Sequence, residues 1–281
     1  MDYGLLSLYK TEGETSRDVD NYLQRKFQIK RVGHLGTLDP FAEGLLVIAI
    51  GKMTKLLPYL DSSFKTYEAV LKLGEKTDTL DKEGVVIERK EAPTITKEML
   101  EEASKKMLLI KSQVPPMYSA LKKDGKPLYK LARKGIEVER KPREIEVRKF
   151  GILSFNHNEI KFFCDVKEGT YVRSLGETFA EYLGTVGHLT SLKRLSIGPF
   201  SLKDSKKKED IALEDSLNPV NYLKKDYDII EINDVLKKHV MDGKPLNLKS
   251  DKDEVIITYQ GSPFAYYVKE NSQYLCKRGL F

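Results

Sequence analysis

The sequence predicts an α+β protein with a central mixed, largely antiparallel sheet that is flanked by helices. Runs of strand length, such as 45–50 and 65–74, are separated by amphipathic helical patterns such as 96–110. The composition shifts near the end of the chain, where three short β stretches follow one another. Because 281 residues suffice for one large and one small domain, we expect a large domain over 1–225 and a small β-rich one over 226–281.

The first elements are indicated by local sequence signals. Residues 4–9 form a short apolar run that is typical of a strand. Thr15 supplies a hydroxyl cap and Asp18 an acid in the first turn, so we expect a helix to begin there. The run 45–50 is wholly apolar and ends at Gly51, as expected of a buried central strand.

Later segments continue the mixture of strands and helices. Residues 65–74 alternate like a half-buried strand, and the pattern at 96–110 places Leu100, Ala103 and Met107 on one helical face. Further expected elements are strands near 143–148 and 159–166, a helix from Val172 to a stop at Gly184, and β stretches at 254–259, 264–269 and 273–277.

Positive charge is concentrated in one part of the chain. Residues 121–149 contain eleven Lys and Arg against five Asp and Glu, and the difference of +6 equals the net charge of the whole protein. Such a segment suits a polyanionic partner. A solvated lysine-rich surface explains the charge equally well, so charge alone does not decide between the two interpretations.

Several classes of protein are disfavoured by the composition. No apolar run approaches the length of a membrane span and no signal segment opens the chain, so we expect a cytoplasmic protein. The two cysteines, Cys164 and Cys276, are far apart and fit no metal spacing, and we expect them to be reduced. The four histidines are scattered along the chain, so no metal site is expected.

Residues 31–44 gather three glycines, a histidine, two carboxylates and a proline directly before the run 45–50. We therefore expect a loop fixed at the edge of a core strand, which is where chemistry is often placed. Within it Asp39 precedes Pro40, which favours an extended conformation at Asp39. For an arbitrary Asp-Pro pair, a turn in which the carboxylate caps the backbone is the more frequent outcome.

The complete sequence of residues 33–46 favours a functional role for Asp39 over a backbone-capping turn. G-H-x-G-T-L-D-P-x-A-x-G-x-L, which begins at Gly33, resembles the active-site motif of the TruB family of tRNA pseudouridine synthases. Residues 65–74 are similar to the second motif of that family, and Gly169 to Arg173 resemble its G-T-Y-I-R segment. The opening motif K-P-x-G-x-T-S is matched from Lys10 onward, except that Thr11 replaces the proline. The resemblance covers about residues 4–200.

The resemblance implies specific roles for individual residues. It makes Asp39 the nucleophile, Arg173 its ion-pair partner, and Tyr67 the ring that stacks on the target base and a candidate acceptor for a proton. The implied contacts to substrate are His34 at a remodelled RNA loop, Leu192 at the pocket wall, Lys10, and the basic helix residues Lys126, Lys130 and Arg133 at phosphates.

The implied reaction converts uridine to pseudouridine at position 55 in the T loop of tRNA, with the base flipped into a pocket. It needs no cofactor and no metal, and the implied protein is a monomer with a pseudouridine synthase fold and a C-terminal module of the RNA-binding PUA type. Whether Asp39 attacks C6 or the sugar carbon is left open. Two alternatives are a non-catalytic RNA-binding or chaperone protein on the same fold, and a glycosidase that uses Asp39 and Glu43.

Overall fold

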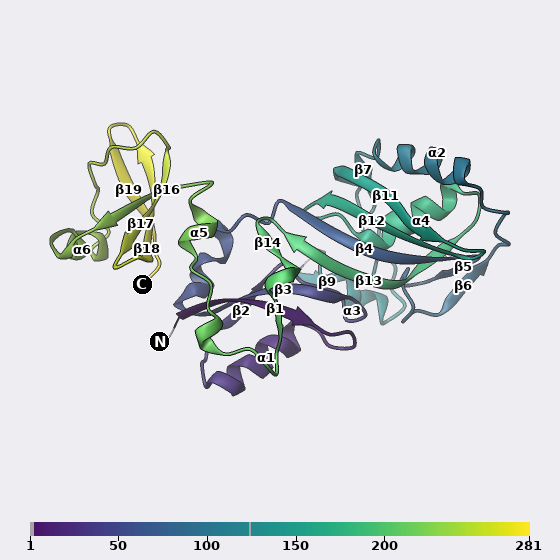
Figure 1. The fold of residues 1–281 in the computed structure, drawn as a ribbon, viewed down its shortest axis with the longest axis horizontal. Helices are drawn as coiled ribbons and strands as arrows, with labels where there is room; N and C mark the ends of the chain where they lie inside the picture. Colours follow the sequence, from purple (N-terminus) through teal and green to yellow (C-terminus); the bar gives the residue numbers. More distant parts are fainter. Residues whose placement is uncertain (1–2, 124) are drawn as a thin grey trace.

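The computed structural model describes residues 3–123 and 125–281, and in that part of the chain two sheets dominate. A nine-stranded sheet with helices against it forms the larger body, and a four-stranded sheet lies at one end of the molecule (Figure 1). None of the helices in these residues combines the length and the apolar character needed to cross a lipid bilayer.

The large sheet is mixed but mostly antiparallel, as predicted. Its order is β11 (Val147–Phe155), β12 (Glu159–Lys167), β4 (Phe64–Leu73), β13 (Gly187–Ile197), β3 (Glu43–Gly51), β1 (Tyr3–Lys10) and β15 (Lys206–Lys207). In addition, β2 (Val32–Leu35) pairs with β3, and β14 (Phe200–Ser201) pairs with β13. Among the strands described in this sheet, β13–β3 and β1–β15 pair in parallel and the other pairs are antiparallel. The predicted fold class is therefore confirmed.

The pairing of β13 with β3 is a short seam that joins the two halves of this sheet. Only Lys193 opposite Glu43 and Arg194 opposite Gly44 are in register across it. Gly44 has φ +105°, and a Cβ at this position would overlap the backbone carbonyl oxygen of Arg194. Only glycine allows this conformation together with so close an approach, so the seam requires Gly44.

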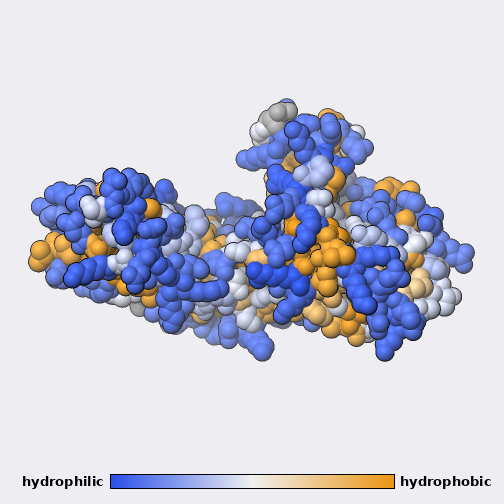
Figure 2. Space-filling view, turned by 90° about the horizontal axis from the view of Figure 1, so that it is seen from above, coloured by the Kyte–Doolittle hydropathy of each residue, from blue (hydrophilic) through white to orange (hydrophobic). Residues whose placement is uncertain are grey.

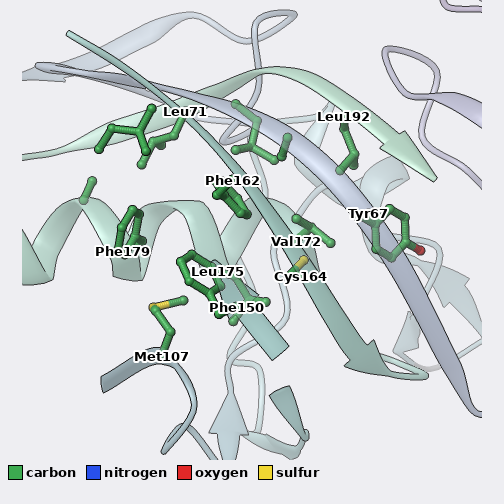
Figure 3. Packing of buried hydrophobic residues seen from close by; sticks show 14 of the residues in the cluster. Tyr67, Leu71, Met107, Phe150, Phe162, Cys164, Val172, Leu175, Phe179 and Leu192 are labelled. Carbon is green, nitrogen blue, oxygen red and sulfur yellow. The ribbon is translucent and has the colours of Figure 1, made fainter. Parts of the chain in front are cut away.

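One hydrophobic core fills the half of the sheet that contains β11, β12, β4 and β13. The helices α2 (Lys97–Met107) and α4 (Val172–Tyr182) contribute the predicted apolar faces, including Met107 and Phe179. The rings of Phe150 and Phe162 stack with centroids 4.9 Å apart. Figure 3 shows Tyr67 at the edge of this cluster, with its hydroxyl directed away from Phe162 and Phe179.

The other half of the sheet is covered by α1 (Ser16–Phe27) and by the 3-10 helix η1 (Lys52–Tyr59). Thr15 and Asp18 form a reciprocal capping box at the start of α1, where the sequence predicts that a helix begins. The smaller elements are β5 (Glu75–Thr77) with β6 (Val86–Arg89), β7 (Ser112–Gln113) with β10 (Arg143–Glu144), β8 (Lys122–Lys123) with β9 (Lys126–Pro127), α3 (Leu128–Ala132), the 3-10 helices η2 (Leu202–Asp204) and η3 (Leu213–Asp215), and α5 (Val220–Leu223).

The C-terminal sheet has a core of its own and is consistent with a PUA-like module. It consists of β16 (Asp228–Ile232), β17 (Glu254–Tyr259), β18 (Ser262–Glu270) and β19 (Gln273–Gly279), with α6 (Asp234–Met241) packed against it. Three tyrosines connect it to the body. Tyr59 of η1 lies 4.5 Å from Tyr266 of β18 between ring centroids, and Tyr227 packs edge-on against both.

Several elements were missed or misassigned by the sequence patterns. The expected loop over 31–44 is wrong in its first part, because 32–35 form β2, which pairs antiparallel with β3. A four-residue strand with buried Val32 and Leu35 at its ends is too short to show alternation. The long strand β13, together with β16 and α6, was not predicted.

We predict that Gly44→Ala destabilises the protein more than Gly13→Ala does. Both glycines have a positive φ, but a Cβ at Gly13 would meet no heavy atom within 4 Å. Gly13→Ala should therefore cost only the conformational term of about 1–2 kcal/mol, while Gly44→Ala adds the overlap with Arg194. Urea unfolding of both variants tests this, and equal losses of stability would contradict the proposed requirement at the seam.

Candidate active site

The segment that carries Asp39 is a short loop over 36–42. Side chains of β1 and α1 hydrogen-bond to its backbone. Its end is a turn in which the amide of Ala42 donates to the carbonyl of Asp39 at 3.1 Å, with Pro40 at the second position. The hydroxyl of Ser16 accepts a hydrogen bond of 2.9 Å from the amide of Leu38. These contacts fix the backbone on both sides of Asp39.

Lys10 lies beneath this turn and is fully buried. Its ammonium donates to the carbonyls of Ala42 at 2.7 Å, Thr11 at 2.9 Å and Pro40 at 3.2 Å. Burial lowers the pKa of Lys10 to about 8, although nearby carboxylates oppose the shift. The structure thus gives this predicted substrate contact a position under the loop, facing backbone carbonyls.

Asp39 and Arg173 are brought together, as the resemblance implies. Arg173 stands in the first turn of α4, and its Nε lies 2.9 Å from Oδ2 of Asp39. Its Nη1 lies 3.3 Å from Oδ2 of Asp81, and it also donates to the carbonyls of Thr79 and Tyr118, both at 2.8 Å. The side chain of Arg173 is only 3% exposed, whereas that of Asp39 is 35% exposed. The cation is thus enclosed, and the carboxylate remains accessible.

The electrostatic surroundings of Asp39 act in opposite directions. Desolvation raises the pKa of the Asp39 carboxyl, and the negative charge of Asp81 adds to this rise. The guanidinium of Arg173 and, more weakly, the ammonium of Lys10 lower it. A carboxylate kept from full hydration is a better nucleophile than one in water, and the two cations oppose its protonation.

Asp39 opens into a cavity of about 280 Å³, which is near the lower end of small-molecule sites. Tyr67 of β4 and Leu192 of β13 form part of its wall, and both are largely buried. Figure 3 shows these two side chains on neighbouring strands at the same end of the core. An aromatic ring, an aliphatic side chain and a carboxylate therefore line one open-mouthed cavity that can take a planar ring.

Arg194 is a second buried arginine beside this cavity, and the sequence patterns did not identify it as a site residue. It lies opposite Tyr67 across the β13–β4 pairing and is fully buried. Its guanidinium donates to the carbonyls of Gly36 at 2.8 Å, Leu45 at 2.9 Å and Thr37 at 3.4 Å. The available signal was an arginine placed among the apolar residues Leu192, Leu195 and Ile197.

His34 lies at the other end of the loop, on β2. Its Nδ1 is 3.0 Å from Oδ2 of the buried Asp20, and its Nε2 is 3.2 Å from the hydroxyl of Thr37. These two partners fix the orientation of the imidazole ring. The ring is partly exposed, so it can contact a ligand that covers the loop.

The basic segment begins at the cavity and continues outward. Ser119 and Ala120 line the cavity, and the amide of Tyr129 donates to the carbonyl of Ser119 at 3.1 Å, which attaches α3 to this wall. Lys126 on β9, Lys130 on α3 and Arg133 just after it are exposed. Much of the surface seen in Figure 2 is hydrophilic in the same way, so exposure alone does not distinguish these three cations.

The structure also bears on metal binding and on the carboxylate pair of the glycosidase alternative. Among the described residues, no group of three or more His, Cys, Asp or Glu is arranged to hold a metal ion. Glu43, the second carboxylate of the glycosidase alternative, pairs with Lys193 at 3.5 Å and is not part of the cavity wall. The carboxylate closest to the pair of Asp39 and Arg173 is Asp81, which is buried behind Arg173.

Comparison with known proteins assigns this chain to a family. A family model described as TruB family pseudouridylate synthase (N terminal domain) matches residues 24–172, which include Asp39 and Tyr67. A tRNA pseudouridine synthase B of Mesoplasma florum is 36% identical over 280 residues, covering 98% of this chain and 97% of that protein. The chain belongs to the TruB family. Pseudouridylate synthases are isomerases, and this TruB protein is therefore an enzyme of that class.

Further relatives agree with this assignment. A tRNA pseudouridine synthase B of Geotalea uraniireducens is 46% identical over 202 residues, which cover 72% of this TruB chain and 65% of the relative. Among solved structures, a Cbf5-Nop10-Gar1 complex contains a chain that matches all of this one with a TM-score of 0.73 at 19% identity and is covered to 85%. At that identity the likeness concerns the fold, and it extends over the C-terminal module.

We predict opposite pH effects for the two partners in the Asp39 network. If Asp39 is the nucleophile that the resemblance implies, it acts when ionised, and the reaction rate should fall as pH decreases through its folded-state pKa. Arg173→Gln removes the main charge that lowers this pKa, and the acid limb of the rate should move to higher pH. Asp81→Asn removes a charge that raises it, and the limb should move to lower pH.

Single-turnover rates of uridine conversion at saturating RNA, measured across acidic to neutral pH, report these shifts. Both variants should also have a lower plateau rate at neutral pH, because Arg173 is removed in one and loses a carboxylate partner in the other. Shifts of the two acid limbs in the same direction would contradict the electrostatic roles assigned to Arg173 and Asp81.

Proposed function

We propose that this TruB protein converts uridine to pseudouridine at position 55 in the T loop of tRNA, with Asp39 as the nucleophile. The observation that carries the proposal is the ion pair of Asp39 and Arg173 at the mouth of a cavity walled by Tyr67 and Leu192. The near full-length likeness to a tRNA pseudouridine synthase B supports tRNA as the substrate class.

The residues at the cavity have different roles in the proposed reaction. A target base inside an RNA loop must leave its stack to reach the cavity. There the ring of Tyr67 stacks on it and Leu192 contacts its edge, while the Asp39 carboxylate attacks the uridine. The bond between N1 and the sugar breaks, uracil turns and rejoins the sugar through C5, and the bond to Asp39 breaks so that the carboxylate is regenerated. Arg173 orients Asp39 and keeps it ionised, and Asp81 in turn orients Arg173.

The remaining contacts hold the RNA. His34, placed at the rim and fixed by Asp20 and Thr37, meets the remodelled loop. Lys126, Lys130 and Arg133 contact phosphates, which positions the RNA without reading its sequence. Lys10 supports binding from beneath the loop, through the backbone of Pro40 and Ala42.

The molecular organisation belongs to the same proposal. Residues 1–225 form the catalytic domain and 226–281 an RNA-binding PUA-like module, which is supported by the separate core of the C-terminal sheet. The protein works in the cytoplasm as a monomer. Light scattering of the pure protein with and without tRNA measures the assembly state, and a stable dimer would refute the last point.

Asp39→Asn should abolish pseudouridine formation while tRNA still binds. The amide is nearly isosteric with the carboxylate but cannot act as a carboxylate nucleophile. Tritium release from C5-labelled uridine in tRNA, together with mapping of the modified position, provides the measurement. Glu43→Gln is the matched control, because it removes a nearby carboxylate outside the cavity, and it should remain active.

Appreciable turnover by Asp39→Asn would remove Asp39 from its role. Modification of uridines outside the T loop with Asp39 intact would instead correct the substrate. Loss of activity in Glu43→Gln with release of free base from the wild type would favour the glycosidase alternative.

Replacing Lys126, Lys130 and Arg133 by Ala should weaken tRNA binding and reduce its salt dependence. Each phosphate contact contributes roughly 0.7–0.9 to the slope of log affinity against log salt, the values for single strands and for duplex DNA, so the slope should flatten. The single-turnover rate at saturating tRNA should stay nearly unchanged, because these residues do not touch the reacting base.

The matched control removes three exposed lysines, Lys97, Lys105 and Lys106, from α2. This helix lies apart from α3 (Figure 1), so the control changes net charge equally without touching the proposed RNA path. If both triple variants alter the slope to the same extent, the basic segment is an ordinary solvated surface.

A further inference from the structure

We propose that Arg194 is a positioning residue that stabilises the phenolate form of Tyr67, the form able to accept the proton from C5 of the rejoined base. The inference rests on the proposed function, since it specifies how one side chain of that site performs its step. It concerns a residue on β13 that sits behind the cavity wall and does not touch the base itself.

The pairing of β13 with β4 places Arg194 next to Tyr67. Arg194 and Tyr67 are directly opposed on β13 and β4, so their side chains leave the same face of the sheet. The guanidinium is held by the carbonyls of Gly36, Thr37 and Leu45. These neutral acceptors fix its position but leave its charge uncompensated.

The two buried arginines of the site differ in their anionic partners. Arg173 is paired with two carboxylates, Asp39 and Asp81. For Arg194, no carboxylate of the described residues lies within ion-pair distance, although it is fully buried. A buried charge without an anion is costly. An anion formed beside it, at the Tyr67 oxygen, is favoured for the same reason.

The groups that face Tyr67 come from three elements. They are Arg194 on β13, Cys164 on β12 and Asp39 on the loop. Burial raises the pKa of Tyr67, and Cys164 and Asp39 add to the rise. Arg194 is the opposing group, and its positive charge lowers the pKa of Tyr67. Tyr67 and Asp39 in turn favour the charged form of Arg194 against its desolvation.

The chemistry of the step requires such a partner. After the sugar has rejoined through C5, that carbon carries both the sugar and a hydrogen. A phenolate oxygen takes this proton, and the electron pair of the C5–H bond returns to the uracil ring. N1, whose bond to the sugar has broken, gains a proton from water, and the phenol returns its proton to water. A neutral phenol could not accept the C5 proton without first losing its own.

The first test measures ionisation directly, without turnover. The tyrosinate absorbance of the wild type minus that of Tyr67→Phe, followed against pH, gives the ionisation of Tyr67. Arg194→Gln should move this transition upward by about one pH unit or more, which leaves about tenfold less phenolate at a given pH. Arg194→Lys keeps a buried cation and should give a smaller shift, and it serves if the Gln variant fails to fold.

Lys193→Gln is the matched control. Lys193 is the neighbouring cation on the same strand, it is partly exposed, and it pairs with Glu43. Its removal should leave the Tyr67 transition unchanged. A Tyr67 transition that is the same in the wild type and in both Arg194 variants would overturn the proposal.

The second test links ionisation to the reaction. Arg194→Lys should lower the single-turnover rate at neutral pH by about tenfold and recover as pH rises, with tRNA affinity little changed. Replacing Tyr67 by difluorotyrosine, which ionises more easily, should restore the rate of Arg194→Lys at neutral pH. A structural role of Arg194 predicts a loss that neither pH nor the fluorinated ring repairs, and that outcome would overturn the proposal.

Failure of the proposed function is distinguishable from failure of this inference. If the wild type forms no pseudouridine in any tRNA, the proposed function is wrong, while the titration still reports whether Arg194 controls Tyr67. If pseudouridine forms at the wild-type rate with Tyr67→Phe, the hydroxyl is not the proton acceptor and the link to Arg194 is overturned, while the proposed function stands.

Discussion

The buried guanidinium of Arg173 is the charge on which the arrangement of the site depends. A cation removed from water must be compensated, at a cost of several kcal/mol if it is not. Here the compensation comes from Asp39, Asp81 and the carbonyls of Thr79 and Tyr118. Segments that are far apart in sequence are thus held at fixed distances by one side chain of α4, and the cavity exists because they meet there.

The loop that carries Asp39 is restrained by two further buried cations. Arg194 takes the carbonyls of Gly36 and Thr37 before Asp39, and Lys10 takes those of Pro40 and Ala42 after it. A short loop with many free carbonyls is thereby converted into a rigid support. The same cations lower the free energy of negative charge in the cavity, which suits a reaction that starts from a carboxylate.

Patterns of apolar residues predicted the elements that obey a single period. The capped helix α1, the wholly apolar strand β3 and the amphipathic helices α2 and α4 were predicted close to their observed bounds. The strand β13 was not, because two bulges interrupt its register against β4 and because it buries His188 and Arg194. Its alternation is therefore broken where the site is built.

The site residues also differ in whether sequence patterns alone could identify them. The motif around Asp39 led to Arg173 only through the resemblance to the TruB family, since nothing in their spacing of more than a hundred residues indicates contact. Lys10 was predicted as a substrate contact from the resemblance alone, because its position beneath the loop depends on how β1 meets the turn at Pro40. Arg194 is one of many cations in the sequence, and only the pairing of β13 with β4 sets it opposite Tyr67.

The three tyrosines between the body and the C-terminal sheet have a consequence for how RNA is chosen. Tyr59, Tyr227 and Tyr266 pack within one hydrophobic cluster that contains residues of both parts, so the module cannot swing on its linker without exposing them. The distance between the Asp39 cavity and the C-terminal surface is then constant. If both bind RNA, their affinities multiply only for molecules whose two contact regions are spaced to match it.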